Sequence, residues 1–207
     1  MSTNERILSP FTLPNGTELK NRLLMAPMTT CTGYYDGTVT SELVEYYRAR
    51  SGSIGTIIVE CCFVDDLGLA FPGAIGIDND EKIAGLAKIA EAIKSKGSKA
   101  LLQIYHGGRM VDPKLIGGRT PVGPSAVAAP RDGAATPVAL TGEEVEGMIG
   151  KFGEAVRRAI QAGFDGVEIH GANTYLIQQF YSPNSNQRDD EWGGSRDNRA
   201  KFPLAVL

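Results

Sequence analysis

The sequence has few cysteines, with three thiols among 207 residues. This is an odd number, and two of the three, Cys61 and Cys62, are adjacent while Cys31 stands apart. Such a set suits neither a disulfide framework nor the spaced ligand pairs of a zinc site. We therefore expect reduced thiols, no metal site and a cytoplasmic location.

The chain also lacks an excess of positive charge and a long hydrophobic run. Its formal net charge of -3 argues against a nucleic-acid partner. No apolar run approaches about 18 residues and the first residues, MSTNER, are polar, so we expect neither a membrane span nor a signal peptide. With 42% hydrophobic and 22% charged residues, the composition is typical of one globular domain over residues 1–207.

Strand-like and helical segments alternate through the chain. Asn15-Gly16 separates two short apolar-polar segments within 11–23, and this dipeptide favours the positive φ angles of a tight turn, so a β-hairpin is predicted. Apolar runs predict strands, and apolar residues at helical spacing predict helices. We expect strands over 22–28, 56–63, 99–106 and 165–171, and helices over 41–50, 80–96 and 141–162.

Two of the predicted helices carry start signals. Asp78 or Asp80 is suited to cap the second helix, and Gly97 to end it. Thr141 and Glu144 form a capping-box pattern at the start of the third helix. These signals are local and predict the helix boundaries on their own.

Successive strand–helix units favour a parallel sheet with helices outside it, because parallel neighbours need long crossovers. A doubly wound sheet that binds a dinucleotide has a Gly-rich turn after its first strand, and APMTTCTGYYDG at 26–37 lacks the G-x-G-x-x-G pattern. A (β/α)8 barrel needs no such turn and carries polar functional residues at the carboxyl ends of its strands. We predict an α/β fold of the (β/α)8 TIM-barrel type, with about the first four β/α units present and a β-hairpin before them.

Polar side chains follow the predicted strands. Alternation puts Gln103 and Tyr105 on one side of their strand, and Glu168 and His170 on one side of theirs. An amide at position 103, among leucine and isoleucine residues, needs hydrogen-bond partners, and a polar ligand is one such partner. The candidate residues are Thr29, Thr30, Cys61, Cys62, Gln103, Tyr105, His106, Arg109, His170, Asn173 and Tyr175.

Several candidates have structural alternatives. Met28 is equally suited to core packing, Arg109 to tying a loop, and His170 to a satisfied position at a strand end. The two adjacent cysteines are suited to a role as small buried hydrophobic side chains.

Three segments carry a family resemblance. They are MAPMTT at 25–30, LLQIYHGGR at 101–109, and the long segment at 163–202 that begins GFDGVEIHGANTYLIQQFYSPNSNQR. Together they resemble successive signatures of the Old Yellow Enzyme family, flavin-dependent ene-reductases built on a (β/α)8 barrel. The resemblance implies an FMN-dependent oxidoreductase that takes hydride from NADH or NADPH and reduces the C=C bond of α,β-unsaturated carbonyl or nitro compounds.

For the cofactor, the resemblance implies a cradle at the first three strand ends. Thr29 would lie near the N5/O4 edge of the isoalloxazine ring, Cys61 would approach the same edge, and Gln103 would hydrogen-bond the pyrimidine part. The implied cofactor-binding residues are Ala26, Pro27, Met28, Thr29, Cys61, Gln103 and His170.

For the substrate, an electron-poor alkene, the resemblance implies three catalytic residues. His170 and Asn173 would hold the carbonyl or nitro oxygen, where two fixed donors stabilise the negative charge that develops after hydride transfer. Tyr175 would donate a proton to the α carbon, since a phenol held within reach is a suitable general acid.

The sequence departs from the family at two points. The family usually has Gly at the position of Thr174, and a β-branched residue resists the backbone angles that Gly permits, which would displace Tyr175. Family members also continue for roughly another half barrel, so the FMN phosphate site is expected outside this chain. Two alternatives stay open: a truncated, non-catalytic remnant or assembly partner that binds no flavin by itself, and a fragment of a dienoyl-CoA reductase-like flavoenzyme. An uncovered half-barrel face predicts a homo-oligomer or association through that face.

Overall fold

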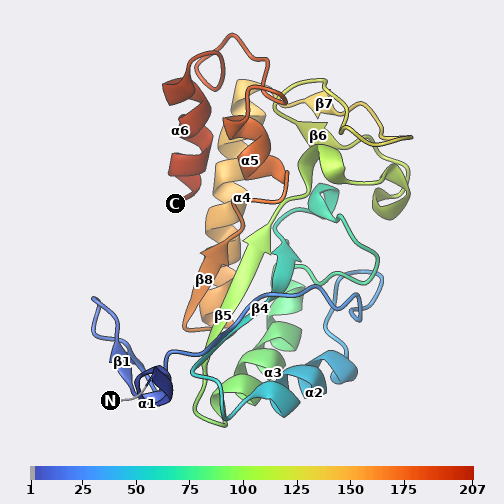
Figure 1. The fold of residues 1–207 in the computed structure, drawn as a ribbon. Coiled ribbons are helices and arrows are strands. Elements are labelled where there is room, and N and C mark those ends of the chain that lie inside the picture. The colour runs from blue at the N-terminus through green and yellow to red at the C-terminus, as the bar shows by residue number, and fades with distance from the viewer. Residues whose placement is uncertain (1–2) are drawn as a thin grey trace.

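The centre of the fold is a four-stranded parallel sheet in the computed structural model, which describes residues 3–207 (Figure 1). The strand order is β3-β4-β5-β8, and each neighbouring pair runs parallel. The predicted α/β fold with a parallel sheet is therefore confirmed. The strands are β3 (Leu24–Met25), β4 (Thr56–Phe63), β5 (Lys99–Tyr105) and β8 (Gly166–Ile169).

The first strand is shorter than predicted. A strand was expected over 22–28, but only the two residues of β3 pair with β4. Pro27 has no N–H to donate to a ladder, so the pairing cannot continue through it. The segment beyond β3 is consequently free to leave the sheet and run over the carboxyl ends of the neighbouring strands.

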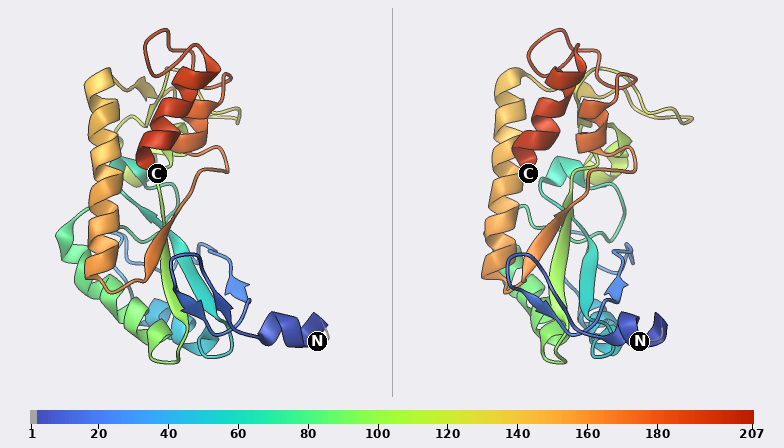
Figure 2. Two further views of the ribbon diagram at one scale, coloured as in Figure 1. Left: turned by 90° about the vertical axis from the view of Figure 1, so that its left-hand side faces the viewer. Right: turned by 60° about the vertical axis from the view of Figure 1, so that its left-hand side comes forward.

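Helices cover one face of the sheet. The helices α2 (Ser41–Arg50), α3 (Ile83–Lys94) and α4 (Gly142–Gln161) pack on this face, and no helix within residues 3–207 lies across the other (Figure 2). Alternate strand residues join the apolar core beneath the helices. No helix in the described part of the chain is long and apolar enough to cross a membrane. The buried strand residues of this core include Ile57, Val59, Cys62, Ala100, Leu102 and Ile104.

The start of α4 is as predicted, whereas the start of α3 is not. The Thr141 hydroxyl accepts the Glu144 N–H at 3.2 Å, and the Glu144 carboxylate accepts the Thr141 N–H at 2.8 Å, so the capping box is confirmed. Ahead of α3, Asn79 caps a short 3-10 turn, because the carboxylate of Asp78 is paired with Lys82 instead. The other predicted cap, Asp80, also makes no cap, since its carboxylate binds Arg157 and Arg158 of α4.

The predicted N-terminal hairpin is confirmed, but its turn differs from the expected one. Strands β1 (Phe11–Thr12) and β2 (Glu18–Leu19) are antiparallel and enclose a five-residue loop, 13–17. Only Gly16 adopts a positive φ, +86°, while the Asn15 side chain accepts the Thr17 N–H at 3.0 Å. The short helix α1 (Thr3–Leu8) precedes the hairpin and was not predicted.

Irregular segments and short elements gather at the carboxyl end of the sheet. The long connection after β5 contains two 3-10 turns and the paired two-residue strands β6 (Val122–Gly123) and β7 (Val138–Ala139). Helices α5 (Leu176–Tyr181) and α6 (Arg196–Val206) follow β8 and pack on each other at the same end (Figure 1). This is the end at which candidate site residues were predicted.

His106 is buried where β5 ends, with 1% of its surface exposed. Its Nδ1 accepts the Gly108 N–H at 3.0 Å, and its Nε2 has no hydrogen-bond partner within residues 3–207. Burial lowers the pKa of His106 to about 4, although the carboxylate of Asp65 acts in the opposite direction. His106 is therefore neutral in the folded protein at neutral pH.

We expect the free energy of unfolding to fall as the pH drops from about 6.5 to about 4. In this window the unfolded chain protonates His106 and the folded chain does not, which favours unfolding by on the order of 3 kcal/mol at the lower limit. Urea unfolding across this range tests the prediction. His106→Gln, which retains an acceptor for Gly108, should remove most of the slope, whereas the control His170→Gln should remove less of it, because His170 is only partly buried. Equal slopes in the wild type and in His106→Gln would contradict the assignment.

Candidate functional site

The predicted site residues lie at the carboxyl ends of the parallel strands. The Thr29 hydroxyl lies 3.3 Å from the sulfur of Cys61. The ring of Tyr175 lies 4.9 Å from that of His170 and 5.2 Å from that of Tyr105, measured between centroids. Cys61 packs in one apolar cluster with both tyrosines. The structure thus brings the ends of three strands and the segment after β3 together at one place.

Gln103 has a protein partner that was not predicted from the sequence. Its Nε2 donates to Glu168 at 2.7 Å, and the two residues stand opposite each other in the β5–β8 register. The Gln103 Oε1 makes no hydrogen bond within residues 3–207 and is the group left for a ligand. Matching polar positions on two neighbouring strands were the available signal for this pair.

Burial shifts the pKa values of both His170, which follows β8, and Tyr175, which directly precedes α5. Burial lowers the pKa of His170, with Glu168 opposing the shift, so the imidazole is neutral near pH 7. Its Nδ1 accepts the Ala172 N–H at 3.3 Å, which leaves the proton on Nε2. Burial, and then the proximity of Cys61, raises the pKa of Tyr175 to about 12, so its phenol stays protonated. Both side chains can therefore donate hydrogen bonds.

Strand β4 supplies two side chains to this region through an irregular register. The pairing with β5 shifts between Val59 and Cys62, so β4 carries one extra residue there. Val59 and Cys62 both pack in the core under the helices, whereas Cys61 packs with the tyrosine cluster. Glu60, between them, is fully buried. Because of the bulge, the consecutive side chains of Glu60, Cys61 and Cys62 have three different surroundings.

Glu60 anchors the segment that follows β3. Its carboxylate accepts the Thr30 N–H at 3.3 Å, the Thr30 hydroxyl at 2.9 Å and the Tyr47 hydroxyl at 3.2 Å. Burial raises the pKa of Glu60, and these three hydrogen bonds oppose that shift. Thr30 immediately follows the predicted flavin-facing residues, so Glu60 fixes where they lie. This role was not predicted from the sequence, although the single carboxylate inside TIIVECCF was a visible signal.

The segment 26–29 is partly exposed to solvent. Met28 is 65% exposed, so the core-packing alternative for this residue is wrong. An exposed thioether next to the Thr29–Cys61 pair suits the apolar face of a planar ring with a polar edge. The residues therefore fit the flavin ring implied by the sequence.

The loop between β8 and α5 is held in an unusual conformation. Asn173 and Thr174 both lie in the left-handed region, with φ of +53° and +62°. The Thr174 N–H donates to Gln178 at 2.5 Å, and the Thr174 carbonyl accepts Gln179 Nε2 at 2.6 Å. Helix α5 thus imposes on Thr174 the conformation that Gly adopts easily.

Gln179 joins this loop to the one after β5. It is 1% exposed, and its Nε2 also donates to the Gly107 carbonyl at 3.1 Å. Its Oε1 accepts the Arg109 N–H at 3.0 Å. A Cβ on Gly108 would lie 2.2 Å from this Oε1, so the close approach requires glycine. Gln179 was missed from the sequence because its partners lie up to 72 residues away.

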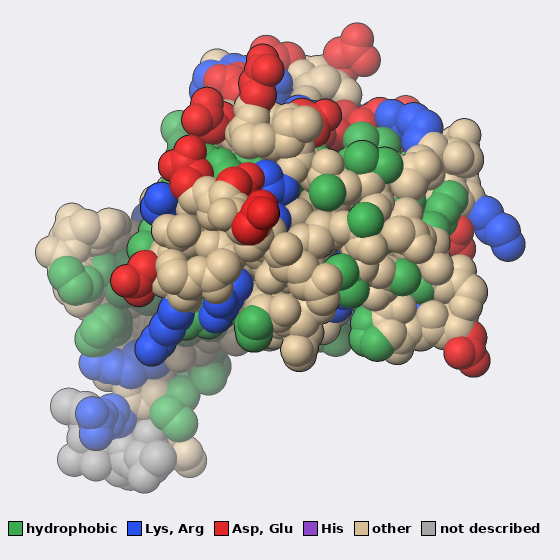
Figure 3. Space-filling view, turned by 90° about the horizontal axis from the view of Figure 1, so that it is seen from above, with side chains coloured by type: hydrophobic (Ala, Val, Ile, Leu, Met, Phe, Trp, Pro, Cys, Tyr) green, Lys and Arg blue, Asp and Glu red, His purple; other side chains and the backbone are tan. Residues whose placement is uncertain are grey.

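The face above the site carries no single dominant charge. Viewed onto the carboxyl ends of the strands, acidic and basic side chains are intermixed with apolar ones, and no histidine is visible (Figure 3). His106 is buried and His170 is partly buried. Of the predicted oxygen-binding donors, His170 therefore lies below this surface, whereas Asn173 is exposed.

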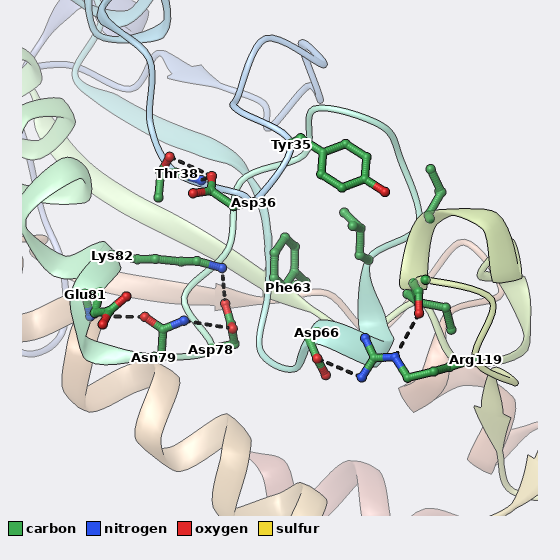
Figure 4. A pocket seen from close by; sticks show the side chains of 14 residues that line it. Tyr35, Asp36, Thr38, Phe63, Asp66, Asp78, Asn79, Glu81, Lys82 and Arg119 are labelled. Carbon is green, nitrogen blue, oxygen red and sulfur yellow. Dashed lines mark hydrogen bonds and ion pairs between the residues drawn. The ribbon is translucent and has the colours of Figure 1, made fainter.

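A separate cleft of about 410 Å³ lies between the loops after β3, β4 and β5 (Figure 4). Its Lys82 is paired with Asp78 and lies 4.4 Å from the Phe63 ring centroid, and its Arg119 binds Asp66 at 2.8 Å. None of the predicted site residues lines this cleft. Its cations already have carboxylate partners, so we do not assign the predicted chemistry to it.

Comparison with known proteins gives consistent matches along the chain. The family model described as NADH:flavin oxidoreductase / NADH oxidase matches residues 6–207. The chain is 89% identical to the NADH:fumarate oxidoreductase of Klebsiella pneumoniae (strain 342), over 100% of this chain and 22% of that protein. It is 59% identical to the NADH:acrylate oxidoreductase of Vibrio harveyi, over 98% of this chain and 20% of that protein. The chain spans about a fifth of the length of these two curated relatives.

Solved structures share the fold as well. The old yellow enzyme homologue from Zymomonas mobilis superposes with a TM-score of 0.88 at 35% identity, covering 97% of this chain and 58% of that one. The likeness therefore extends over nearly all of the described fold.

We expect Thr174→Gly to raise the free energy of unfolding by about 1 kcal/mol. A left-handed conformation costs a β-branched residue on the order of 1–3 kcal/mol, and the greater freedom of glycine in the unfolded chain offsets part of this gain. Urea unfolding measures the change. Asn173→Gly is the matched control and should have a smaller effect, because asparagine tolerates this region. A loss of stability in Thr174→Gly alone would show that the loop is not strained there.

Proposed function

Because this chain belongs to the NADH:flavin oxidoreductase / NADH oxidase family, which includes the Old Yellow Enzymes, we propose that it is the flavin-binding part of an ene-reductase. The cofactor of this family is FMN, and its hydride donor is a nicotinamide. The proposed reaction is reduction of the C=C bond of an α,β-unsaturated carbonyl or nitro compound by NADH or NADPH. The observation that carries this proposal is the convergence of Thr29, Cys61, Gln103, His170 and Tyr175 at one edge of the sheet.

We also propose that the parallel sheet is the first four β/α units of a (β/α)8 barrel, as one domain. The bare face of the sheet supports this proposal, because a barrel would enclose that face. Association through this face and a cytoplasmic location stay predictions.

The proposed flavin cradle is built from the segment 26–29, Cys61, Gln103 and His170. When bound there, FMN supplies hydride transfer between the nicotinamide and the alkene. The exposed Met28 side chain offers an apolar contact to the flavin ring. The free Oε1 of Gln103 is an acceptor for the N–H group of that ring. Glu60 holds the segment 26–29 in place through its hydrogen bonds to Thr30.

The proposed oxygen-binding donors are His170 and Asn173. The neutral imidazole of His170 carries its proton on Nε2, and the Asn173 side chain is exposed on the adjoining loop. Two donors fixed at one oxygen stabilise the negative charge that develops there more strongly than they stabilise the neutral substrate. Gln179 and Gln178 hold the loop that carries Asn173, which reduces the reorganisation that binding requires.

The proposed proton donor is Tyr175. Its hydroxyl has no hydrogen-bond partner within residues 3–207, and its raised pKa keeps the proton in place until a carbanion-like centre is presented. The position at the start of α5 fixes the ring against His170 and Tyr105.

A second candidate function is an electron-input unit. The curated relatives named for fumarate and acrylate are about five times as long as this chain. Their names therefore do not say which part of each protein reduces the alkene. In this candidate the chain would hold the flavin that receives electrons from NADH, and another part of a longer protein would reduce the alkene.

Flavin uptake and anaerobic titration distinguish the candidates. The purified full-length protein should be yellow or take up added FMN, NADH should bleach it, and an alkene such as acrylate or 2-cyclohexenone should restore the colour. Bleaching by NADH without reoxidation by any alkene favours the electron-input unit. If the protein takes up no flavin, the result supports the alternative of a non-catalytic remnant or assembly partner.

We expect Tyr175→Phe to slow alkene-dependent reoxidation on the order of 100-fold, because a positioned general acid contributes roughly that much. Reduction by NADH should be unchanged, since it does not use this proton. Stopped-flow absorbance separates the two half-reactions. Tyr181→Phe is the control and should affect neither, because Tyr181 lies at the far end of α5 and is 43% exposed. Equal losses in both half-reactions would rule out the proton-donor role.

A further inference from the structure

Gln103 and Glu168 form a polar pair on the face of the sheet that no helix within residues 3–207 covers (Figure 2). They stand opposite each other in the β5–β8 register, and their side chains meet at 2.7 Å. Their strand neighbours Ile104 and Ile169 pack in the core under the helices, so Gln103 and Glu168 point to the other face. The pair therefore lies on the side of the sheet where the flavin cradle is proposed.

The chemistry of this pair allows one orientation of the Gln103 amide. A carboxylate accepts hydrogen bonds and has no proton to donate, so the amide must turn its NH2 group to Glu168. Within residues 3–207, Glu168 is in no ion pair, so no cation competes with the amide for its charge. A hydrogen bond to a charged acceptor is stronger than one between neutral groups. Glu168 thus fixes which end of the Gln103 side chain is left for a ligand.

The end that is left is the amide oxygen, and a ligand can reach it. Gln103 Oε1 makes no hydrogen bond within residues 3–207. The fully buried side-chain atoms without a partner in this part of the chain do not include it, so it has access to the surface. An amide nitrogen carries two hydrogens, of which Glu168 takes one. Gln103 therefore presents an acceptor together with one further N–H, which matches an imide edge, where a ring N–H stands beside a carbonyl.

We propose that Glu168 is a positioning residue that makes Gln103 selective for the imide edge of the flavin ring. It acts through Gln103, because it holds the amide so that Oε1 accepts the ring N–H and the NH2 group cannot take that place. Without this constraint the amide is free to turn by half a rotation, and half of its orientations then set a donor against a donor. This inference rests on the proposed function, since it needs a flavin beside Gln103.

The affinity of the full-length protein for FMN is the first test, and it does not depend on turnover. Glu168→Gln keeps the size of the side chain but supplies an amide, which can donate to Gln103 Oε1 as well as accept from Nε2. The Kd for FMN should rise on the order of tenfold, as expected when one oriented hydrogen bond is lost. Glu146→Gln is the control and should leave Kd unchanged, because Glu146 is exposed on α4, on the helix-covered face.

A shorter carboxylate separates positioning from charge. Glu168→Asp keeps the negative charge but ends one carbon earlier, so it cannot hold the Gln103 amide at the same place. It should weaken FMN binding about as much as Glu168→Gln. If the charge alone were responsible, Glu168→Asp would bind FMN as the wild type does.

A double-mutant cycle shows whether Glu168 acts through Gln103. Gln103→Leu removes the amide, and adding Glu168→Gln to it should change Kd by less than about twofold, because no amide is left to orient. Glu168 is half-buried, so water can satisfy its carboxylate in the Gln103→Leu background.

Resonance Raman spectra of the bound flavin give a readout that a purely structural role would not move. The band that contains bending of the ring N–H reports on the hydrogen bond made by that group. It should shift from its wild-type position in Gln103→Leu and part of the way in Glu168→Gln, and it should stay in place in Glu146→Gln.

Other outcomes overturn the inference. If the wild type binds FMN and Glu168→Gln binds it equally well with an unmoved band, Gln103 does not need Glu168, while the proposed function stands. Equal effects of Glu168→Gln with and without the Gln103 amide place its action elsewhere. A wild-type protein that binds no flavin removes the proposed function and this inference together. If Glu168→Gln does not fold, Glu168→Asp decides the matter by the same measurements.

Discussion

The register between β5 and β8 is the constraint on which the candidate site depends. It sets Gln103 directly opposite Glu168 and lets their side chains bond at 2.7 Å. The same alternation places His170 beside the ring of Tyr105, at 6.4 Å between centroids. A slip of one residue would turn these polar side chains toward the helices, where the apolar core offers them no partners.

Buried polar side chains attach the neighbouring loops to this sheet. Glu60 fastens the segment after β3 through Thr30, and Gln179 fastens the loop after β8 to the loop after β5. Each makes several hydrogen bonds in a dry environment, where a satisfied network specifies one arrangement. These hydrogen bonds therefore hold the two loops that would touch cofactor and substrate.

The sequence was most informative where the cause of a structure is local. The capping box at Thr141 and the apolar run of β4 depend only on neighbouring residues, and both predictions hold. The predicted cap at Asp78 or Asp80 was wrong, because Lys82 pairs with Asp78 and the distant Arg157 and Arg158 bind the carboxylate of Asp80. Gln179 was missed for the same reason, since nothing near it in sequence shows that its amide bridges two loops. The family resemblance identified the candidate residues, but only the fold shows which side chains hold them in place.

The bulge in β4 has a consequence for how this protein can vary. An ordinary strand offers one inward position between Val59 and Cys62, whereas here two residues share that interval. One of them, Glu60, secures a loop, and the other, Cys61, faces the aromatic rings. Anchoring and ring contact are thus separate tasks on adjacent residues, so the thiol can be exchanged for another small side chain to retune the surface over the rings without loosening the anchor.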